Sequence, residues 1–109
     1  FSMLFTGDAS APMEQLWMRE GFDLHVTVLK VGHHGSRFAS SSAFLAVARP
    51  RIAIISVGRD NRYGQPAPAA LARLRAVGAR IYRTDRDGEI ALTSDGTRVW
   101  VRTQLPAAP

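Results

Sequence analysis

The feature that most constrains this chain is a series of short apolar runs separated by segments with helical spacing. The run at 52–57, Ile-Ala-Ile-Ile-Ser-Val, is nearly continuous in apolar residues, which is the pattern of a strand buried on both faces. Similar runs lie at 3–5, 26–31 and 81–83, and each leads into a glycine or a polar segment. The alternation of strands with helices predicts an α/β fold, with a mixed sheet flanked by helices.

Three segments between these runs have the apolar spacing and the end signals of helices. Pro12 and Gly21 mark the ends of the first, over 12–19, and Pro50 ends the second, which a serine at 40–42 can cap. The apolar residues expected in these two helices are Leu16 and Trp17 in the first, and Phe44, Leu45, Val47 and Ala48 in the second. The third helix, over 68–77, is expected to bury one stripe (Leu71, Leu74 and Val77) and to expose Arg73 and Arg75.

The C-terminal part has the pattern of a closing antiparallel hairpin. Residues 89–93 and 98–103 alternate between apolar and polar types, and Ser94-Asp95-Gly96 lies between them as a turn. Asp87-Gly88 is a further turn signal. We expect one partial domain over residues 1–104, with a frayed tail over 105–109.

Composition limits the chemistry that the 109 residues can carry. Cysteine is absent, so any metal ion must be held by histidine, aspartate or glutamate. No apolar run approaches the roughly 20 residues that a membrane-spanning helix needs. The net charge is +5, and 11 arginines lie from Arg49 onward; such a surface can attract phosphate groups or simply keep the chain in solution.

Two predicted strand ends carry polar residues that an apolar core does not need. The first is Thr6-Gly7-Asp8, whose carboxylate can coordinate a cation or cap the next helix. The second is Gly32-His33-His34-Gly35-Ser36. Adjacent histidines on a glycine-flanked loop can point in different directions, so one can bind metal while the other contacts substrate; the alternative is a surface pair. Ser36 is expected to turn or cap the loop, because the sequence has no Gly-x-Ser-x-Gly nucleophile motif.

A third strand end leads into the polar loop 58–66. It contains Asn61, Arg62, Tyr63 and Gln65, whose donors can hold phosphate oxygens, although such loops are also ordinary surface connections. His25 lies at the start of a predicted strand, outside these loops, and we expect it to be structural or exposed.

Four segments together resemble successive blocks of one known domain. They are Leu4-Phe5-Thr6-Gly7-Asp8-Ala9; Val28-Leu29-Lys30-Val31-Gly32-His33-His34-Gly35-Ser36; Ile54-Ile55-Ser56-Val57-Gly58 with Asn61-Arg62-Tyr63-Gly64; and Ile81-Tyr82-Arg83-Thr84-Asp85 with Gly88. In this order and spacing, over about residues 4–93, they are similar to the metallo-β-lactamase-like domain of the ComEC/Rec2 DNA-uptake proteins. A single His-His-Gly has little specificity, whereas four ordered blocks are strongly specific.

The resemblance implies the later, C-terminal portion of an αββα sandwich, and it gives roles to the strand-end residues. Asp8 matches the aspartate that usually bridges two metal ions, His34 is expected as a metal ligand, and His33 as the catalytic group on the substrate side. The substrate-binding positions that it implies are Ser36, Asn61, Arg62, Tyr63 and Gln65. The implied chemistry is hydrolysis of a phosphodiester, assisted by zinc or manganese in the complete domain.

The resemblance also implies a cellular setting. The parent protein would lie in the bacterial cytoplasmic (inner) membrane, with DNA and other competence-channel components as partners. This chain would then be a soluble extracytoplasmic domain or a membrane-associated one. Two rival functions stay open: another metallo-β-lactamase-like phosphodiesterase, and a non-catalytic DNA-binding or structural module.

Two departures from the family pattern bear on activity. The early metal motif, His-x-His/Asp-x-Asp-His, is absent, so the isolated chain is expected to bind metal weakly or not at all and to be inactive. Gln65 stands where relatives commonly have a histidine, and a glutamine cannot shuttle a proton at neutral pH. If the first sheet of the sandwich is missing, the apolar face that it would cover predicts self-association of the chain.

Overall fold

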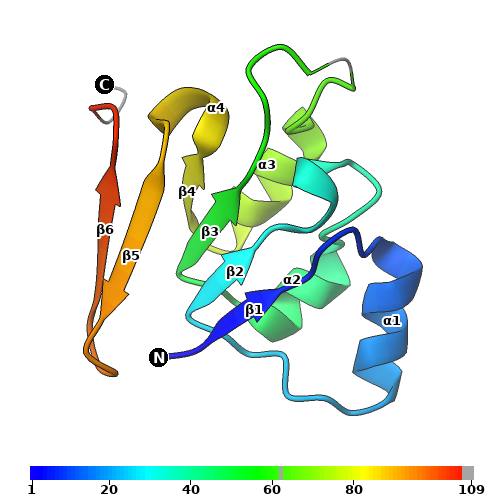
Figure 1. Cartoon of the computed structure of the whole chain (residues 1–109). Helices are drawn as coiled ribbons and strands as arrows, with labels where there is room; N and C mark the ends of the chain where they lie inside the picture. Colours follow the sequence, from blue (N-terminus) through cyan, green and yellow to red (C-terminus); the bar gives the residue numbers. More distant parts are fainter. Residues whose placement is uncertain (62, 107–109) are drawn as a thin grey trace.

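The computed structural model describes residues 1–61 and 63–106; Arg62 and residues 107–109 lie outside the described part. The elements in chain order are β1 (Met3–Phe5), α1 (Ala11–Arg19), β2 (Val28–Lys30), the 3₁₀ turn η1 (Gly32–Gly35), α2 (Ser42–Ala48), β3 (Ile52–Ile55), α3 (Pro68–Ala76), β4 (Arg80–Arg83), α4 (Thr84–Asp87), β5 (Ile90–Ser94) and β6 (Val99–Thr103) (Figure 1). This order confirms the predicted succession and adds two short helical turns, η1 and α4. Within the described residues, no helix has the length and apolarity needed to cross a bilayer.

Strands β1 to β4 form a single parallel sheet in the order β1-β2-β3-β4. Strands β5 and β6 form a separate antiparallel sheet of two strands, and Figure 1 shows this hairpin standing beside the larger sheet. The prediction of a closing hairpin is therefore confirmed, whereas the prediction of one mixed sheet is wrong. The reason is α4, which follows β4 directly and ends at Gly88. The positive φ of Gly88 (70°) suits glycine and turns the chain away from the sheet edge.

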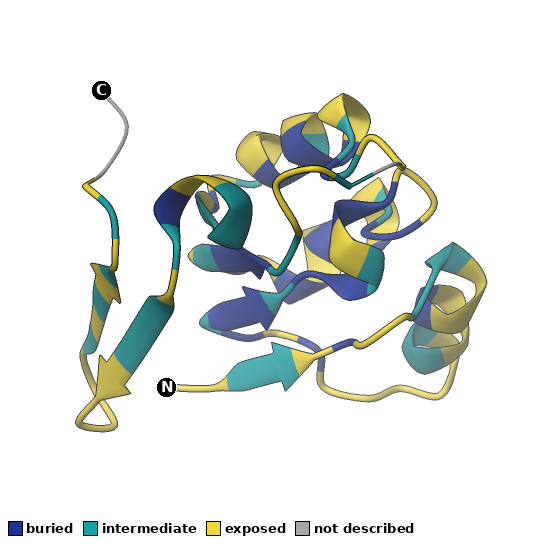
Figure 2. Ribbon diagram, turned by 45° about the horizontal axis from the view of Figure 1, so that its top comes forward, coloured by how far each residue is buried: buried dark blue, intermediate teal, exposed yellow. Residues whose placement is uncertain are grey.

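The hydrophobic core lies between the parallel sheet and the helices α2 and α3. Its fully buried members include Leu29, Ala53 and Ile55 from the sheet, and Phe44, Leu45 and Leu74 from the helices. Because β2 and β3 have a neighbouring strand on each side, they carry the most continuous apolar runs. Figure 2 shows the buried residues concentrated in these strands and on the inner sides of the helices.

Several helix side chains have a burial that apolar spacing alone does not predict. Val47 and Leu16 are 44% and 40% exposed, whereas Glu14 is buried, with 1% of its surface accessible. Arg73, expected to be exposed, is half-buried and donates a hydrogen bond to the Ser40 carbonyl at 2.8 Å. Apolar spacing does not predict the burial of these polar side chains, because they are stabilised by hydrogen bonds to backbone groups of a neighbouring loop.

Both ends of the described chain are tied to other elements. The ammonium group of Phe1 donates to the Gly96 carbonyl at 3.2 Å, in the turn between β5 and β6. The Leu105 amide donates to the Asp87 carbonyl at 3.0 Å. The predicted tail thus begins at an anchored residue, and its last three residues lie outside the described part.

Candidate functional site

Three loops meet at the carboxyl ends of β1, β2 and β3. Because the strands are parallel, these ends lie at the same edge of the sheet, which is where open α/β sheets commonly bind ligands. The loops span residues 6–10, 31–41 and 56–67, and all three contribute to the lining of a cavity of about 810 Å³. The lining residues are Asp8, His33, His34, Ser36, Arg37, Phe38, Tyr63, Gly64, Gln65, Ala67 and Pro68.

Backbone hydrogen bonds join the three loops to one another. The His33 amide donates to the Gly7 carbonyl at 2.7 Å, and the Ala67 amide donates to the Gly35 carbonyl at 2.9 Å. Glycine is needed for this close approach: a Cβ on Gly35 would lie 2.7 Å from the Cβ of Pro66. The glycines around the histidine pair therefore bring the loops together.

His34 is held in a defined tautomer. Its Nδ1 lies 2.7 Å from the carbonyl oxygen of Ser56 at the end of β3. A carbonyl can only accept, so Nδ1 carries the proton and Nε2 keeps its lone pair in the neutral ring. Metal-binding histidines commonly use the same arrangement, with one ring nitrogen donating to a carbonyl and the other free to coordinate. His34 thus has the geometry expected of a ligand.

His33 presents an unusual buried atom. Within the described part of the chain, its Nδ1 is buried and has no hydrogen-bond partner. Leaving such a group unsatisfied costs about 1–3 kcal/mol. Both histidines also have φ of 54°, a left-handed conformation that non-glycine residues rarely adopt and that concentrates at functional sites. The strained pair and the unpartnered nitrogen both favour a binding role for this turn.

The donors at the cavity fit a divalent cation in kind but not in number. Imidazole nitrogens and a carboxylate suit zinc or manganese, and Asp8 is exposed. Among the residues that the structure describes, however, no three His, Asp or Glu side chains are grouped closely enough to hold one ion. The alternative of Asp8 as a helix cap finds no support, since α1 is preceded by Ser10 at its N-cap position.

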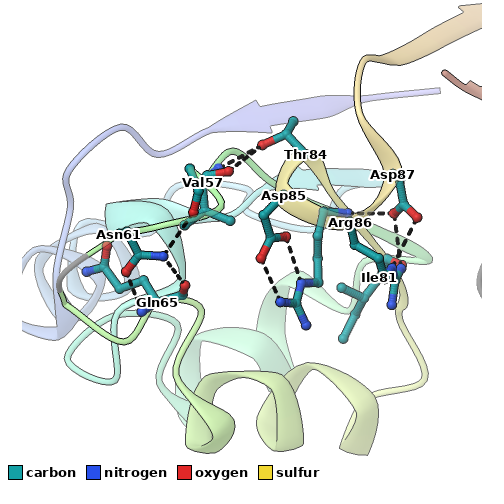
Figure 3. Close-up of polar contacts among 10 residues, drawn as sticks. Val57, Asn61, Gln65, Ile81, Thr84, Asp85, Arg86 and Asp87 are labelled. Atoms are coloured by element: carbon teal, nitrogen blue, oxygen red, sulfur yellow. Dashed lines mark hydrogen bonds and ion pairs between the residues drawn. The ribbon is translucent and has the colours of Figure 1, made fainter. Parts of the chain in front are cut away.

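Two of the expected substrate-binding residues have their polar atoms engaged within their own loops. The Ser36 hydroxyl accepts from the Phe38 amide at 3.1 Å, which agrees with a turn-forming role. The Asn61 side chain donates to the carbonyls of Gly58 and Gln65 and accepts from the Gln65 amide at 2.8 Å (Figure 3). Asn61 is not among the residues lining the cavity; its contacts shape the loop that carries Tyr63 and Gln65.

The remaining expected residues are distributed unevenly. Tyr63 and Gln65 line the cavity, and Tyr63 is 83% exposed. Arg62 lies outside the described residues. His25 is exposed and does not line the cavity, as expected.

Arg37 and Phe38 also line the cavity, although the sequence pattern did not indicate them as site residues. They directly follow the histidine turn, and Phe38 is 61% exposed. The available signal was an aromatic residue next to an arginine on a polar loop, where burial cannot explain the aromatic side chain.

A polar cluster on α4 supports the end of β3 next to the site (Figure 3). The Thr84 hydroxyl accepts from the Val57 amide at 2.8 Å and donates to the Val57 carbonyl at 3.0 Å. Arg83 pairs with Asp85 at 2.7 Å, and the hydrogen bond from this pair raises the pKa of Arg83. Together with β4, the α4 turn fixes the start of the loop that carries Tyr63 and Gln65.

The chain is similar to three bacterial proteins. ComE operon protein 3 of Bacillus subtilis is 39% identical over 89 residues, competence protein ComA of Neisseria gonorrhoeae is 39% identical over 90 residues, and recombination protein 2 of Haemophilus influenzae is 38% identical over 89 residues. Each alignment covers 82% of this chain. The chain therefore belongs to the ComEC/Rec2 family, which confirms the resemblance of its four sequence blocks.

The similarity concerns a small part of each relative. The alignments cover 12%, 13% and 11% of the Bacillus, Neisseria and Haemophilus proteins, respectively. No family model matches the chain, and no solved structure matches it.

Proposed function

We propose that this chain forms one side of a metal-dependent phosphodiesterase site, within a longer protein that takes up DNA. In this proposal the chain is the later part of a metallo-β-lactamase-type αββα sandwich. The main supporting observation is the cavity at the strand ends, where Asp8, His33 and His34 meet on adjacent loops. The similarity to a protein named as a competence protein supports the DNA-uptake context.

The geometry of the side chains supports the proposed roles. The Ser56 carbonyl keeps the His34 Nδ1 protonated and so directs the Nε2 lone pair to a ligand. Asp8 contributes a carboxylate, and His33, which lines the cavity, is the substrate-side group. A zinc or manganese ion, held with further ligands from the rest of the protein, would supply a water of lowered pKa.

The number of metal-ligating side chains in this chain determines how the isolated chain is expected to behave. Since no three metal-ligating side chains group together in the described residues, we expect the purified chain to bind zinc or manganese weakly and not to cleave DNA. The parent protein of this proposal lies in the cytoplasmic membrane, with this chain as an extracytoplasmic or membrane-associated domain, and its partners are DNA and other competence-channel components.

The test compares histidine and aspartate variants in the complete parent protein. His34→Ala and Asp8→Asn should each lower manganese-dependent cleavage of linear DNA by at least about 10- to 100-fold, since even the loss of an outer-shell partner of a metal ligand has an effect of this size. They should also lower the metal content of the purified protein. His25→Ala is the matched control, because His25 is exposed and lies away from the cavity. Unchanged cleavage in both site variants would contradict the proposal.

Gln65 favours a second candidate function, a DNA-binding module without catalytic activity. Gln65 lines the cavity at the position where the family resemblance implies a histidine, and a glutamine cannot transfer protons at neutral pH. The net charge of +5 is compatible with nucleic-acid binding. In the complete protein, this candidate predicts salt-sensitive DNA binding without cleavage, and Gln65→His should restore measurable cleavage only if the metal ligands are otherwise complete.

A further inference from the structure

Two exposed aromatic side chains lie at the same cavity on separate loops. Phe38 and Tyr63 are 61% and 83% exposed, and both line the cavity of about 810 Å³. The guanidinium of Arg37 lies 4.7 Å from the centroid of the Phe38 ring, within the range of a cation–π contact. Arg37 and Phe38 also line a second hollow of about 650 Å³. Arg37 and Phe38 therefore form a ridge between the cavity and the second hollow.

The backbone beneath this ridge is held by two charged side chains from different helices. The buried carboxylate of Glu14 accepts hydrogen bonds from the Ser40 and Ser41 amides, at 2.6 and 2.9 Å. Arg73 donates to the carbonyls of Ser40, Arg37 and Ala39, at 2.8, 2.9 and 2.9 Å. The exposed Phe38 ring thus projects from a fixed loop, and fixing a side chain before binding reduces the entropy that binding must overcome.

We propose that Phe38 and Tyr63 form a stacking platform for unpaired nucleobases, and that Arg37 binds the adjacent phosphate. Single-stranded nucleic acid offers both groups together, because its bases are free to stack on aromatic rings and its backbone is anionic. Duplex bases stay stacked within the helix and cannot reach such a platform without being flipped out. The inference rests on the proposed function, since it assigns single-stranded nucleic acid as the substrate class of the same cavity.

Binding of fluorescent probes to the purified chain, measured by anisotropy in EDTA, tests this assignment separately from cleavage. The probes are a short oligothymidylate, an abasic phosphodiester oligomer of the same length, and a duplex. Phe38→Ala should weaken oligothymidylate binding by about 5- to 100-fold, as expected for the loss of one stacked base, and should leave the abasic probe unaffected. Phe38→Trp should preserve binding, and Arg37→Ala should weaken binding of both single-stranded probes.

Phe22→Ala is the matched control, because Phe22 is 60% exposed and lies outside both hollows. Equal losses on the oligothymidylate and abasic probes, tighter binding of the duplex, or no binding of any probe would each overturn the stacking platform. Cleavage by the complete protein is scored independently. If Phe38→Ala loses base-dependent binding while His34→Ala retains full cleavage, the platform stands and the proposed metal site fails. If Phe38→Ala keeps base-dependent binding while His34→Ala loses cleavage, the metal site stands and the platform fails.

Discussion

Two loops that line the cavity, residues 31–41 (the first loop) and residues 56–67 (the second loop), are held in place in different ways. Residues 37–41 are held from outside, by Glu14 of α1 and Arg73 of α3, which lie 26 to 36 positions away along the chain. Gly58 and Gln65 are held from within the second loop, by the side chain of Asn61. The first loop is therefore coupled to the packing of two helices, whereas the second can change with little effect on the core.

This difference matters for a binding site. A loop fixed by distant charged groups keeps its exposed side chains in place before a ligand arrives, at the cost of linking the site to global stability. A loop fixed by its own asparagine can vary in sequence at low cost to the fold. Substitutions in the two supports should therefore separate stability from site geometry.

The largest effect is expected for Glu14→Ala. The change leaves the buried amide of Ser40 and the half-buried amide of Ser41 without an acceptor. At about 1–3 kcal/mol for each unsatisfied donor, the free energy of unfolding should fall by roughly 2–6 kcal/mol. Urea unfolding followed by circular dichroism measures this loss. Glu20→Ala, at an exposed position just beyond α1, is the control. An equal loss in the two variants would show that Glu14 does not support the first loop, and the contrast between the two loops would then disappear.

Arg73→Met should have the next largest effect. Methionine keeps much of the apolar stem but removes the hydrogen bonds to the carbonyls of the first loop. We expect a loss of about 1.5–3 kcal/mol in the free energy of unfolding, typical of a hydrogen bond to a charged group. Arg75→Met is the matched control, because Arg75 is exposed on the same helix. A loss no greater than that of the control would show that Arg73 does not support the loop.

Asn61→Ala should cost less, about 1 kcal/mol, because its hydrogen bonds are partly open to solvent. The Gln65 amide loses its acceptor, so its hydrogen exchange should accelerate while the core amides of β2 and β3 stay protected. Asp60→Ala, at an exposed neighbouring position, controls for a general loosening of the loop. Faster exchange in the core would mean that the second loop is coupled to the fold after all.

Much of the fold and part of the site could be predicted from local pattern. The apolar run at β3 indicated a buried strand, and the polar residues at three strand ends indicated a shared edge, where the structure indeed brings Asp8, His33 and His34 to one cavity. The chemical roles of these residues stay predictions. Their positions were accessible from the sequence because strand ends are local features and parallel strands end at the same edge.

The supports of the first loop could not be predicted in the same way. Glu14 and Arg73 have the spacing of solvent-facing residues, and their partners are backbone groups of a distant loop whose position depends on the whole fold. The prediction of a mixed sheet was wrong for a related reason. The α4 turn sets the direction of the hairpin, and the strand pattern of β5 and β6 does not show that direction. Asn61 was expected to meet substrate, but its amide is already satisfied by its own loop.

The smallest effect concerns Asp87, in the α4 turn that supports the start of the second loop. Burial raises the pKa of Asp87, but hydrogen bonds from the Arg86 guanidinium and the Arg83 amide outweigh it, so the pKa lies below its ordinary value of 3.8. A carboxyl group with a lower pKa in the folded chain stabilises the fold above the unfolded pKa, and this stability is lost as the pH falls through the folded pKa. Because Arg86 is 39% exposed, its ion pair is screened by solvent.

Asp87→Asn should therefore lower the free energy of unfolding by under about 1 kcal/mol at neutral pH. The difference between the wild type and the variant should shrink as the pH falls below about 4, because Asp87 first takes up a proton in the unfolded chain and, at lower pH, also in the folded chain. Urea unfolding curves at a series of pH values measure this difference directly. A difference that stays constant down to about pH 2, or that grows, would show that Asp87 acts through its shape alone and not through the charge that holds the α4 turn.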